Sequence, residues 1–387
     1  MKTIIAIFLF LFILVTMAFS QSNGTTKPFT LQGKIIGQDS GKIIFEYQCV
    51  DGYIRDTAAI INGEFMFKGN IDEPTNAWIK GGNNLNTTRI YLESGVLKVN
   101  LLKDKFDKLE VTGSKTQDES NELILIKDPI NFKMAILRSQ RDCINDTIEK
   151  TKDELMLKRM KKNYAEKDNQ IEQLRGQNHA NDIAFIRTHP KSFISLELLE
   201  NEVSNDLTPL DSSKTLYKGL DLISQNSIYG KELKKIIVEK GKSAVGAIAP
   251  DFKTTDLNNK TLTLSQFQGK NEVLLVFWAS YCVPCRASFP HLKEIYKKYH
   301  SKGLEIILVS VDNNKEAWIE AVNQESIGMW HQIHYSGSFD KNKRILGNIR
   351  ENYYVFGIPA ELLIDKTGKI IARYRGVDEK LAALFKD

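Results

Sequence analysis

The chain has 387 residues, of which 42% are hydrophobic and 26% charged, and its formal net charge is +5 at pH 7. This composition is typical of a soluble globular protein, and the length allows two or three domains. The positive charge is modest and spread along the chain, without an aromatic-rich basic tract or a glycine-rich phosphate loop. We therefore predict no nucleic acid and no nucleotide as a partner.

Residues 1–20 have the pattern of a secretory signal peptide. A single lysine precedes an apolar run that ends at Phe19 and is shorter than the ~20 residues needed to span a bilayer. Ala18 and Ser20 are small residues at positions −3 and −1 of a cleavage site after Ser20. No cysteine lies near this site, which argues against a lipoprotein. We predict export to the periplasm or another extracytoplasmic space, where disulfides matter.

Residues 28–113 are expected to form an all-β domain. Asn62 and Gly63 are a strong signal for a hairpin turn between two strands. Apolar residues alternate with polar ones in several short segments, which are 29–35, 43–47, 65–67, 97–101 and 109–111. We predict an antiparallel sandwich or small barrel, and we find no catalytic constellation within it.

Residues 114–243 are expected to be helical. A set of apolar residues lies on one helical face amid dense Lys and Glu: Leu157, Met160, Tyr164, Ile171 and Leu174. We favour a helix that packs within its own domain over one that binds a partner or dimerises. His189-Pro190 should end a helix, because the residue before proline avoids the α region. The small, turn-rich segment that starts at Ser243 places a domain boundary there.

The chemistry of the chain is concentrated where an apolar strand meets two cysteines. Residues 273–278 read as a buried strand, and a helical pattern starts at Val283. Cys282 therefore lies just before a helix and Cys285 in its first turn. Free N–H groups and the helix dipole favour a thiolate at Cys282, which should lower the pKa of this thiol. Cys285 can then resolve a mixed disulfide on Cys282, so the pattern predicts a thiol–disulfide exchange site with a redox-active Cys282–Cys285 disulfide.

The stretch Phe277-Trp-Ala-Ser-Tyr-Cys282-Val-Pro-Cys285, with Pro290 expected to kink the helix, resembles the active site of the thioredoxin superfamily. Within it, the chain is most similar to the extracytoplasmic branch that includes TlpA and ResA. The resemblance implies a thioredoxin fold for residues 244–387, in the order β-α-β-α-β-β-α with a terminal helix at 379–385. The alternative, a zinc-binding CxxC, needs a second ligand pair, for which His331 and His334 are one weak candidate. No metal and no cofactor is predicted.

The N-terminal segment carries a resemblance of its own. Asn62-Gly-Glu-Phe65 and Tyr91-Leu-Glu93-Ser-Gly95 occur in the order found in a β-rich domain of unknown role. That domain often precedes a thioredoxin-like domain in bacterial envelope proteins.

Gly357-Ile358-Pro359 resembles the cis-proline loop of the same superfamily. The resemblance implies that this loop lies against the cysteine pair, where the Ile358 backbone binds an extended substrate strand. The predicted substrate-binding residues are Trp278, Tyr281, Pro284, Ile358 and Pro359. For Trp278, simple packing in the core is an equally good interpretation.

The chain departs from its relatives at three positions. Val276 stands where thioredoxins have a buried aspartate, Ser288 where ResA-like proteins have a glutamate, and Ala360 where a threonine follows the cis-proline. Because such carboxylates move the proton of the resolving thiol, we hypothesise slower deprotonation of Cys285. Glu361 could substitute for them if its side chain turns inward.

We therefore predict an extracytoplasmic thiol–disulfide oxidoreductase that reduces protein disulfides and receives electrons from a membrane or envelope donor. A thiol peroxidase is a weaker alternative, because the proline and threonine or serine it needs are replaced by Leu275 and Ala279. A third possibility is an envelope-binding protein that uses the β domain. The even number of cysteines permits a disulfide between Cys49 and Cys143. We favour the alternative that each is an unpaired, buried side chain that packs like a small hydrophobic residue.

Overall fold

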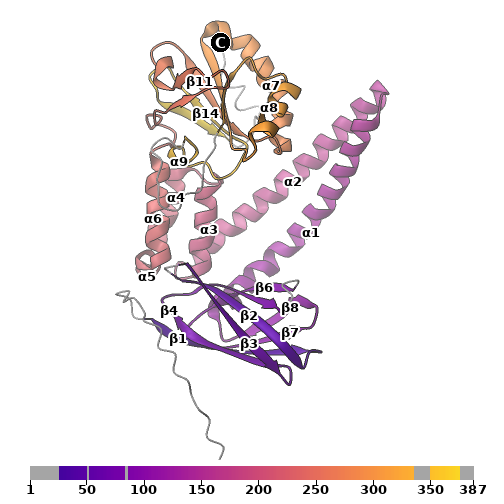
Figure 1. Ribbon diagram of the computed structural model, residues 1–387, viewed down its shortest axis with the longest axis vertical. Helices are drawn as coiled ribbons and strands as arrows, with labels where there is room; N and C mark the ends of the chain where they lie inside the picture. Colours follow the sequence, from indigo (N-terminus) through magenta and orange to yellow (C-terminus); the bar gives the residue numbers. More distant parts are fainter. Residues whose placement is uncertain (1–25, 50–51, 83–85, 335–348, 375–387) are drawn as a thin grey trace, which may run out of the picture. The chain divides into compact units, whose positions relative to one another are not determined.

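A computed structural model of the chain describes residues 26–49, 52–82, 86–334 and 349–374. The chain divides into two compact units, residues 1–114 and 115–387 (Figure 1). The predicted signal peptide and the predicted terminal helix at 379–385 lie outside the described residues.

The first unit is an eight-stranded sheet with the strand order β6-β5-β2-β3-β4-β1-β7-β8. Residues 93 and 94 alone connect β6 to β7, although these strands lie toward opposite ends of that order. The sheet therefore curls into a barrel-like form. Its strands are β1 (Lys27–Ile36), β2 (Ser40–Cys49), β3 (Gly52–Ile61), β4 (Glu64–Ile71), β5 (Thr75–Gly81), β6 (Thr87–Leu92), β7 (Gly95–Leu102) and β8 (Lys105–Thr112).

The predicted antiparallel pairing holds for this sheet except at β1 and β7, which run parallel. Closure explains the exception, because β7 returns beside β1 after the chain has passed around the other strands. The predicted turn at Asn62 and Gly63 is confirmed, since both residues have positive φ values, 54° and 79°, as a two-residue hairpin turn requires. Alternate side chains such as Phe29, Leu31 and Phe45 fill the interior.

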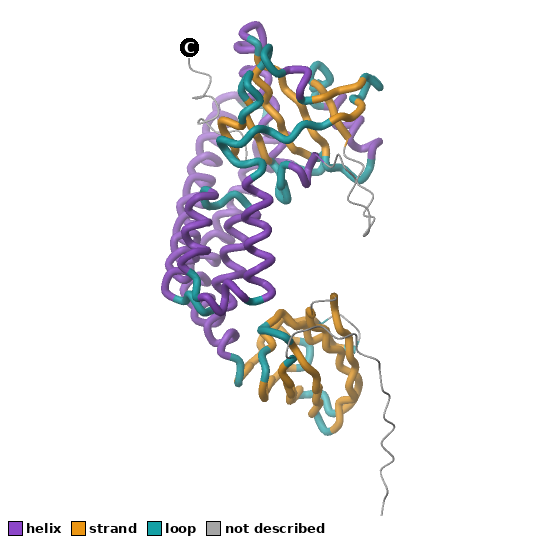
Figure 2. Tube along the Cα trace, turned by 90° about the vertical axis from the view of Figure 1, so that its left-hand side faces the viewer, coloured by secondary structure: helices purple, strands orange, loops and turns teal. Residues whose placement is uncertain are grey.

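The second unit begins with helices (Figure 2). Ile171 and Leu174 pack against Met134 and Leu137 of the preceding helix, which confirms packing within the domain. The predicted helix end at His189-Pro190 is also confirmed. The helices are α1 (Lys115–Lys150), α2 (Glu154–Thr188), α3 (Phe193–Ser204), α4 (Leu210–Gly219), α5 (Leu222–Asn226) and α6 (Ile228–Gly241).

The rest of this unit contains a five-stranded sheet with the order β13-β12-β11-β14-β15. Strand β11 is central, parallel to β12 and antiparallel to β14. The elements are β11 (Glu272–Trp278), α7 (Val283–Tyr299), β12 (Leu304–Ser310), α8 (Lys315–Gln324), β13 (His331–His334), α9 (Ile349–Asn352), β14 (Ala360–Ile364) and β15 (Ile370–Tyr374). The predicted strands and helices from β11 to β15 are all present as far as Tyr374, but β13 and α9 also lie between α8 and β14.

The sequence patterns did not predict three short strands. The chain enters this part through a small hairpin, β9 (Lys253–Thr255) and β10 (Thr261–Thr263), and β13 extends the main sheet beyond β12. The two faces of the main sheet carry separate apolar clusters. One contains Cys285 and Phe289 of α7, and the other contains Tyr353.

The two cysteines outside the CxPC motif are both free thiols. Cys49 is half-buried at the end of β2, whereas Cys143 is exposed on α1. The prediction of a buried small hydrophobe is therefore wrong for Cys143, because this side chain lies on the solvent side of the long helix.

Candidate active site

The CxPC motif lies where the central strand passes into α7. Cys282 is the N-cap residue of α7, and Cys285 lies in the first turn. The Cys285 backbone N–H donates to Cys282 Sγ at 3.3 Å, so this sulfur takes the position of a capping oxygen. A negative charge on the same sulfur would face the positive end of the helix. Local sequence explains this geometry, since Pro284 suits the first helical turn and needs no N–H partner.

Cys282 and Cys285 form a disulfide, with their Cα atoms 5.3 Å apart. The two residues differ in access to solvent: Cys282 is 7% exposed and Cys285 only 1%. An external thiol or disulfide can therefore reach Cys282 more readily than Cys285. Pro290 lies inside α7 as predicted, and the kink expected there stays a prediction.

The Ile358–Pro359 peptide bond is cis, as the sequence pattern predicted. Ile358 packs against both apolar clusters of the sheet and is half-buried. The approach to this loop is fixed by Arg350, whose Nε donates to Val355 O at 2.9 Å and whose Nη2 donates to Phe356 O at 3.0 Å. These contacts hold the segment before the cis-proline in one conformation.

The predicted substrate-binding residues fall into two groups. Tyr281 is 69% exposed and Pro284 is also exposed, while Ile358 and Pro359 are half-buried. Trp278 is fully buried and packs edge-to-face on Phe289, with ring centroids 5.1 Å apart. This burial supports the alternative interpretation of Trp278, as a residue of the core.

Two acidic residues that the sequence did not single out hold the segment before Cys282. The buried Asp312 carboxylate accepts hydrogen bonds from Ser280 N at 2.9 Å, Ser280 Oγ at 2.6 Å and Ser310 Oγ at 2.7 Å. Glu325 binds Arg286 Nε at 2.6 Å, and Arg286 Nη1 donates to Ser280 O at 3.4 Å. The one available signal was the position of Asp312 just past a parallel strand, at the edge where sites of open α/β sheets form.

The three departures from related sequences take ordinary places in the fold. Val276 is buried in β11, Ala360 is buried at the start of β14, and Ser288 Oγ donates to Cys285 O at 2.7 Å. Glu361 has no exposed surface, so its side chain does turn inward.

Two tyrosines next to the cis-proline loop are poor acids. Burial, reinforced by the charge of Asp251, raises the pKa of Tyr353 far above its ordinary value, and its Oη donates to Pro250 O at 2.7 Å. Burial also raises the pKa of Tyr354 to about 12, with further contributions from Glu200, Glu232 and Glu239. Both phenols are therefore neutral at physiological pH.

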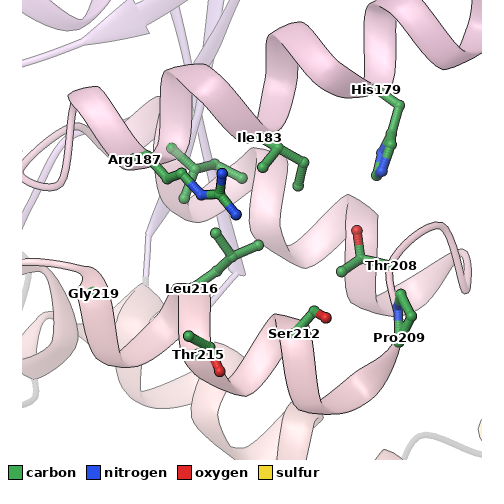
Figure 3. A pocket seen from close by; sticks show the side chains of 10 residues that line it. His179, Ile183, Arg187, Thr208, Pro209, Ser212, Thr215, Leu216 and Gly219 are labelled. Atoms are coloured by element: carbon green, nitrogen blue, oxygen red, sulfur yellow. The ribbon is translucent and has the colours of Figure 1, made fainter.

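The helical part holds a hollow of about 560 Å³ that is lined by none of the CxPC or cis-proline residues. His179 and Arg187 project into it from α2, and Thr208 and Leu216 approach from the other side (Figure 3). His179 Nδ1 lies 3.1 Å from the buried carboxylate of Glu202. Among the residues that the structure describes, His, Cys, Asp and Glu side chains form no group of three or more suited to a metal ion.

Known proteins resemble the chain in its C-terminal part above all. Residues 244–385 match the Redoxin family, and residues 29–120 match a domain of unknown function, DUF4369. The thiol-disulfide oxidoreductase ResA of Bacillus thuringiensis strain Al Hakam is 31% identical over 172 residues, which are 44% of this chain and 93% of that protein. The chain belongs to the TlpA/ResA-like family. It is a thiol-disulfide oxidoreductase.

Other ResA proteins and solved structures are each similar to about a third of the chain. ResA of Geobacillus kaustophilus is 33% identical over 132 residues, 34% of this chain and 70% of that protein. A crystal structure of the thioredoxin domain of a thiol-disulfide oxidoreductase from Bacteroides vulgatus is 31% identical, with a TM-score of 0.32, and covers 36% of this chain and 95% of its own. A putative thiol:disulfide interchange protein DsbE from Chlorobium tepidum is 29% identical, with a TM-score of 0.31 and coverage of 36% and 92%. The helices within the described ranges of this ResA-like chain are all too short or too polar to cross a membrane.

Proposed function

We propose that this ResA-like chain reduces disulfides of protein substrates outside the cytoplasm, with Cys282 as the nucleophile and Cys285 as the resolving thiol. The observation that carries the proposal is the bonded cysteine pair at the start of α7, with one sulfur in the N-cap position and the other almost fully buried. That asymmetry supports different roles for the two thiols.

The reaction starts from the reduced pair. The Cys282 thiolate attacks one sulfur of a substrate disulfide, and the other substrate sulfur leaves as a thiolate that takes a proton from water. Cys285 then loses its proton and attacks Cys282 Sγ, which breaks the mixed disulfide and releases the second substrate thiol. The substrate gains two electrons and two protons, and the Cys282–Cys285 disulfide forms. A dithiol donor of the envelope must reduce this disulfide before the next turnover.

The substrate surface that we propose surrounds Cys282. Tyr281 and Pro284 present exposed side chains beside it, and the Ile358 backbone at the cis-proline loop can pair with an extended substrate segment. Pairing through the backbone favours unfolded or locally extended protein segments that carry a disulfide, rather than one particular side chain.

The test of this mechanism replaces one cysteine at a time. Cys285→Ala should accumulate substrate proteins as mixed disulfides on Cys282, because the resolving thiol is gone, and mass spectrometry of trapped species would identify them. Cys282→Ser should abolish turnover of a disulfide-bonded protein by the reduced chain. Turnover by Cys282→Ser at the wild-type rate would contradict the assigned roles.

The extracytoplasmic location has its own test. The apolar segment of residues 1–20 supports it, and N-terminal sequencing of the protein from an envelope fraction should give Gln21 as the first residue. A mature chain that begins at Met1 in the cytoplasmic fraction would overturn the proposed export.

A further inference from the structure

Few ionisable groups are buried near the site. Within the described part of residues 244–374, Asp312 and Glu361 are the only buried residues with a carboxyl side chain. The Asp312 carboxylate is already occupied by the hydrogen bonds from Ser280 and Ser310. Glu361 is therefore a buried carboxyl to which the proposed reaction, so far, assigns no role.

Glu361 lies on the same face of the sheet as the cysteines. On β14, Leu362 and Ile364 belong to the cluster on one face, whereas Leu363 belongs to the cluster that contains Cys285. Side chains alternate along a strand, so Glu361 shares the face of Leu363. The side chain of Glu361 has 0% exposure, so the carboxyl is enclosed on that face.

The strand register brings this carboxyl beside the strand that leads to Cys282. Glu361 is directly opposite Val276 on β11, and opposite Tyr374 on β15. Val276 belongs to the same cluster as Cys282 and Cys285. Side chains that are directly opposite on neighbouring strands have Cβ atoms about 4.5–5.5 Å apart. The Glu361 side chain thus lies beside position 276, on the neighbouring strand.

We propose that Glu361 accepts the proton of Cys285 when this thiol attacks the mixed disulfide, and returns the proton when the pair is reduced again. The inference rests on the proposed dithiol reaction. Cys285 is 1% exposed, so its thiol is shielded from direct exchange with bulk water. A carboxyl enclosed in an apolar environment gives up its proton less readily than one in water, which brings it closer in basicity to a thiol.

The proton and electron transfers balance with this carboxyl included. The ionised Glu361 takes the proton as the Cys285 sulfur bonds to Cys282 Sγ, and the bond between Cys282 and the substrate sulfur breaks. Glu361 is then protonated and the substrate leaves as a thiolate. When a dithiol donor reduces the disulfide, the Cys285 sulfur recovers its proton from Glu361, which is ready for the next cycle.

Other titratable groups face the same cluster and must be separated from Glu361 in any pH profile. Cys282, Cys285, Tyr296 and Tyr299 come from α7, and Tyr374 comes from β15. The position that β11 contributes opposite Glu361, Val276, does not titrate. Among these facing groups in the described residues, Glu361 is the one carboxyl, so its chemical type separates it from the thiols and phenols.

The decisive variant is Glu361→Gln, which keeps the size of the side chain and removes the exchangeable proton site. Rapid acid quenching of the full-length reduced chain with a disulfide-bonded peptide resolves the two steps. We expect attack by Cys282 to stay within about twofold of wild type, and release of the second thiol at neutral pH to slow by about 100-fold. Below neutral pH, the release rate of wild type should fall as a carboxyl is protonated, and this limb should be lost in Glu361→Gln.

Two further variants control for packing. Glu202→Gln also replaces a buried carboxyl by an amide, in the helical part, and should leave both steps unchanged. The double variant Val276→Asp, Glu361→Leu moves the carboxyl across to β11 and should restore most of the release rate. A Glu361→Gln release rate and pH profile equal to those of wild type would overturn the inference.

A measurement on the wild-type chain keeps the inference testable if these variants do not fold. The infrared difference spectrum between the dithiol and disulfide forms should contain the C=O band of a carboxyl that changes its protonation, and an absent band overturns the role of Glu361. Failure of the proposed function looks different, because the wild-type chain would then not turn over disulfides through Cys282 at all.

Discussion

The Asp312 carboxylate fixes the residues that lead into Cys282. It accepts two hydrogen bonds from Ser280, one from the backbone N–H and one from the hydroxyl, and a third from Ser310. Ser280 precedes Cys282 by two residues, so the position of the proposed nucleophile depends on this contact. Asp312 is buried, and its charge makes each of these hydrogen bonds stronger than one between neutral groups.

Replacing Asp312 should therefore reduce both the stability of the chain and the rate of attack by Cys282. Asp312→Asn weakens three charge-assisted bonds, and we expect a loss of about 1–3 kcal/mol in the free energy of unfolding. We also expect a tenfold or greater fall in the rate of attack by Cys282, measured by acid quenching with a disulfide peptide. Ser280→Ala is the matched control, since it keeps the backbone contact and should lose less on both measures. Equal attack rates in Asp312→Asn and wild type would contradict this role.

At the scale of elements, Tyr353 links α9 and the loop before β14 to the first residues of the thioredoxin-like part, near Ser243 and Pro250. Its phenol donates to Pro250 O at 2.7 Å, and its carbonyl accepts from Ser243 Oγ at 2.9 Å. The loop before β14 carries the cis-proline, so Tyr353 supports the surface on which we propose that substrates bind.

Burial of Tyr353 predicts a pH dependence at the alkaline end. Its pKa is raised in the folded state, so the unfolded chain ionises this phenol near pH 10 while the folded chain keeps the proton. Ionisation of this phenol therefore leaves the free energy of unfolding unchanged below pH 10. Above pH 10 it lowers that free energy by up to about 1.4 kcal/mol per pH unit.

Tyr353→Phe should make this alkaline fall shallower, although it also lowers the stability at neutral pH by about 1 kcal/mol through the lost hydrogen bond. Urea unfolding at several pH values between 8 and about 11 measures both effects. Tyr281→Phe removes an exposed phenol and is the matched control, for which we expect the wild-type slope. A slope in Tyr353→Phe identical to that of wild type would show that another group governs the alkaline fall.

Elements with strong local signals could be predicted from the sequence, and those set by tertiary contacts could not. Asn62 and Gly63 specify their turn by themselves, because both adopt positive φ. Strand β13 gave no such signal: it has four residues, and its buried Gln332 donates from Nε2 to Ile327 O at 2.7 Å, a contact that no sequence pattern reveals. The parallel pairing of β1 with β7 also depends on closure of the whole sheet.

The candidate site shows the same division. The CxPC motif and the cis bond before Pro359 follow from short motifs, whereas the contact between Asp312 and Ser280 spans 32 residues of sequence. From the sequence, an inward side chain at Glu361 could be expected only if side chains alternate regularly along its strand. The register that puts it opposite Val276 needed the structure.

At the scale of the molecule, the helical part and the thioredoxin-like part belong to one compact unit, although the sequence suggested a boundary near Ser243. Asp206, just beyond α3, joins them. Its carboxylate binds Lys240 Nζ of α6 at 2.7 Å and Arg373 Nε of β15 at 3.0 Å. Arg373 also donates to Ser243 O and Tyr353 O, so β15, α6 and the segment between them are linked through one guanidinium.

This linkage predicts that the two parts unfold together and that Asp206 is needed for it. The side chains of Lys240 and Arg373 are only 5% and 7% exposed, so Asp206→Ala would leave two nearly buried positive charges without this carboxylate. Removing one partner of a buried ion pair costs about 3–5 kcal/mol, and we expect a loss of that size in calorimetry. Glu239→Gln, which breaks the exposed pair of Glu239 with Lys242, is the matched control and should change stability by less than about 0.5 kcal/mol. If Asp206→Ala matched that control, the helices and the five-stranded sheet would have to be held together by their apolar contacts alone.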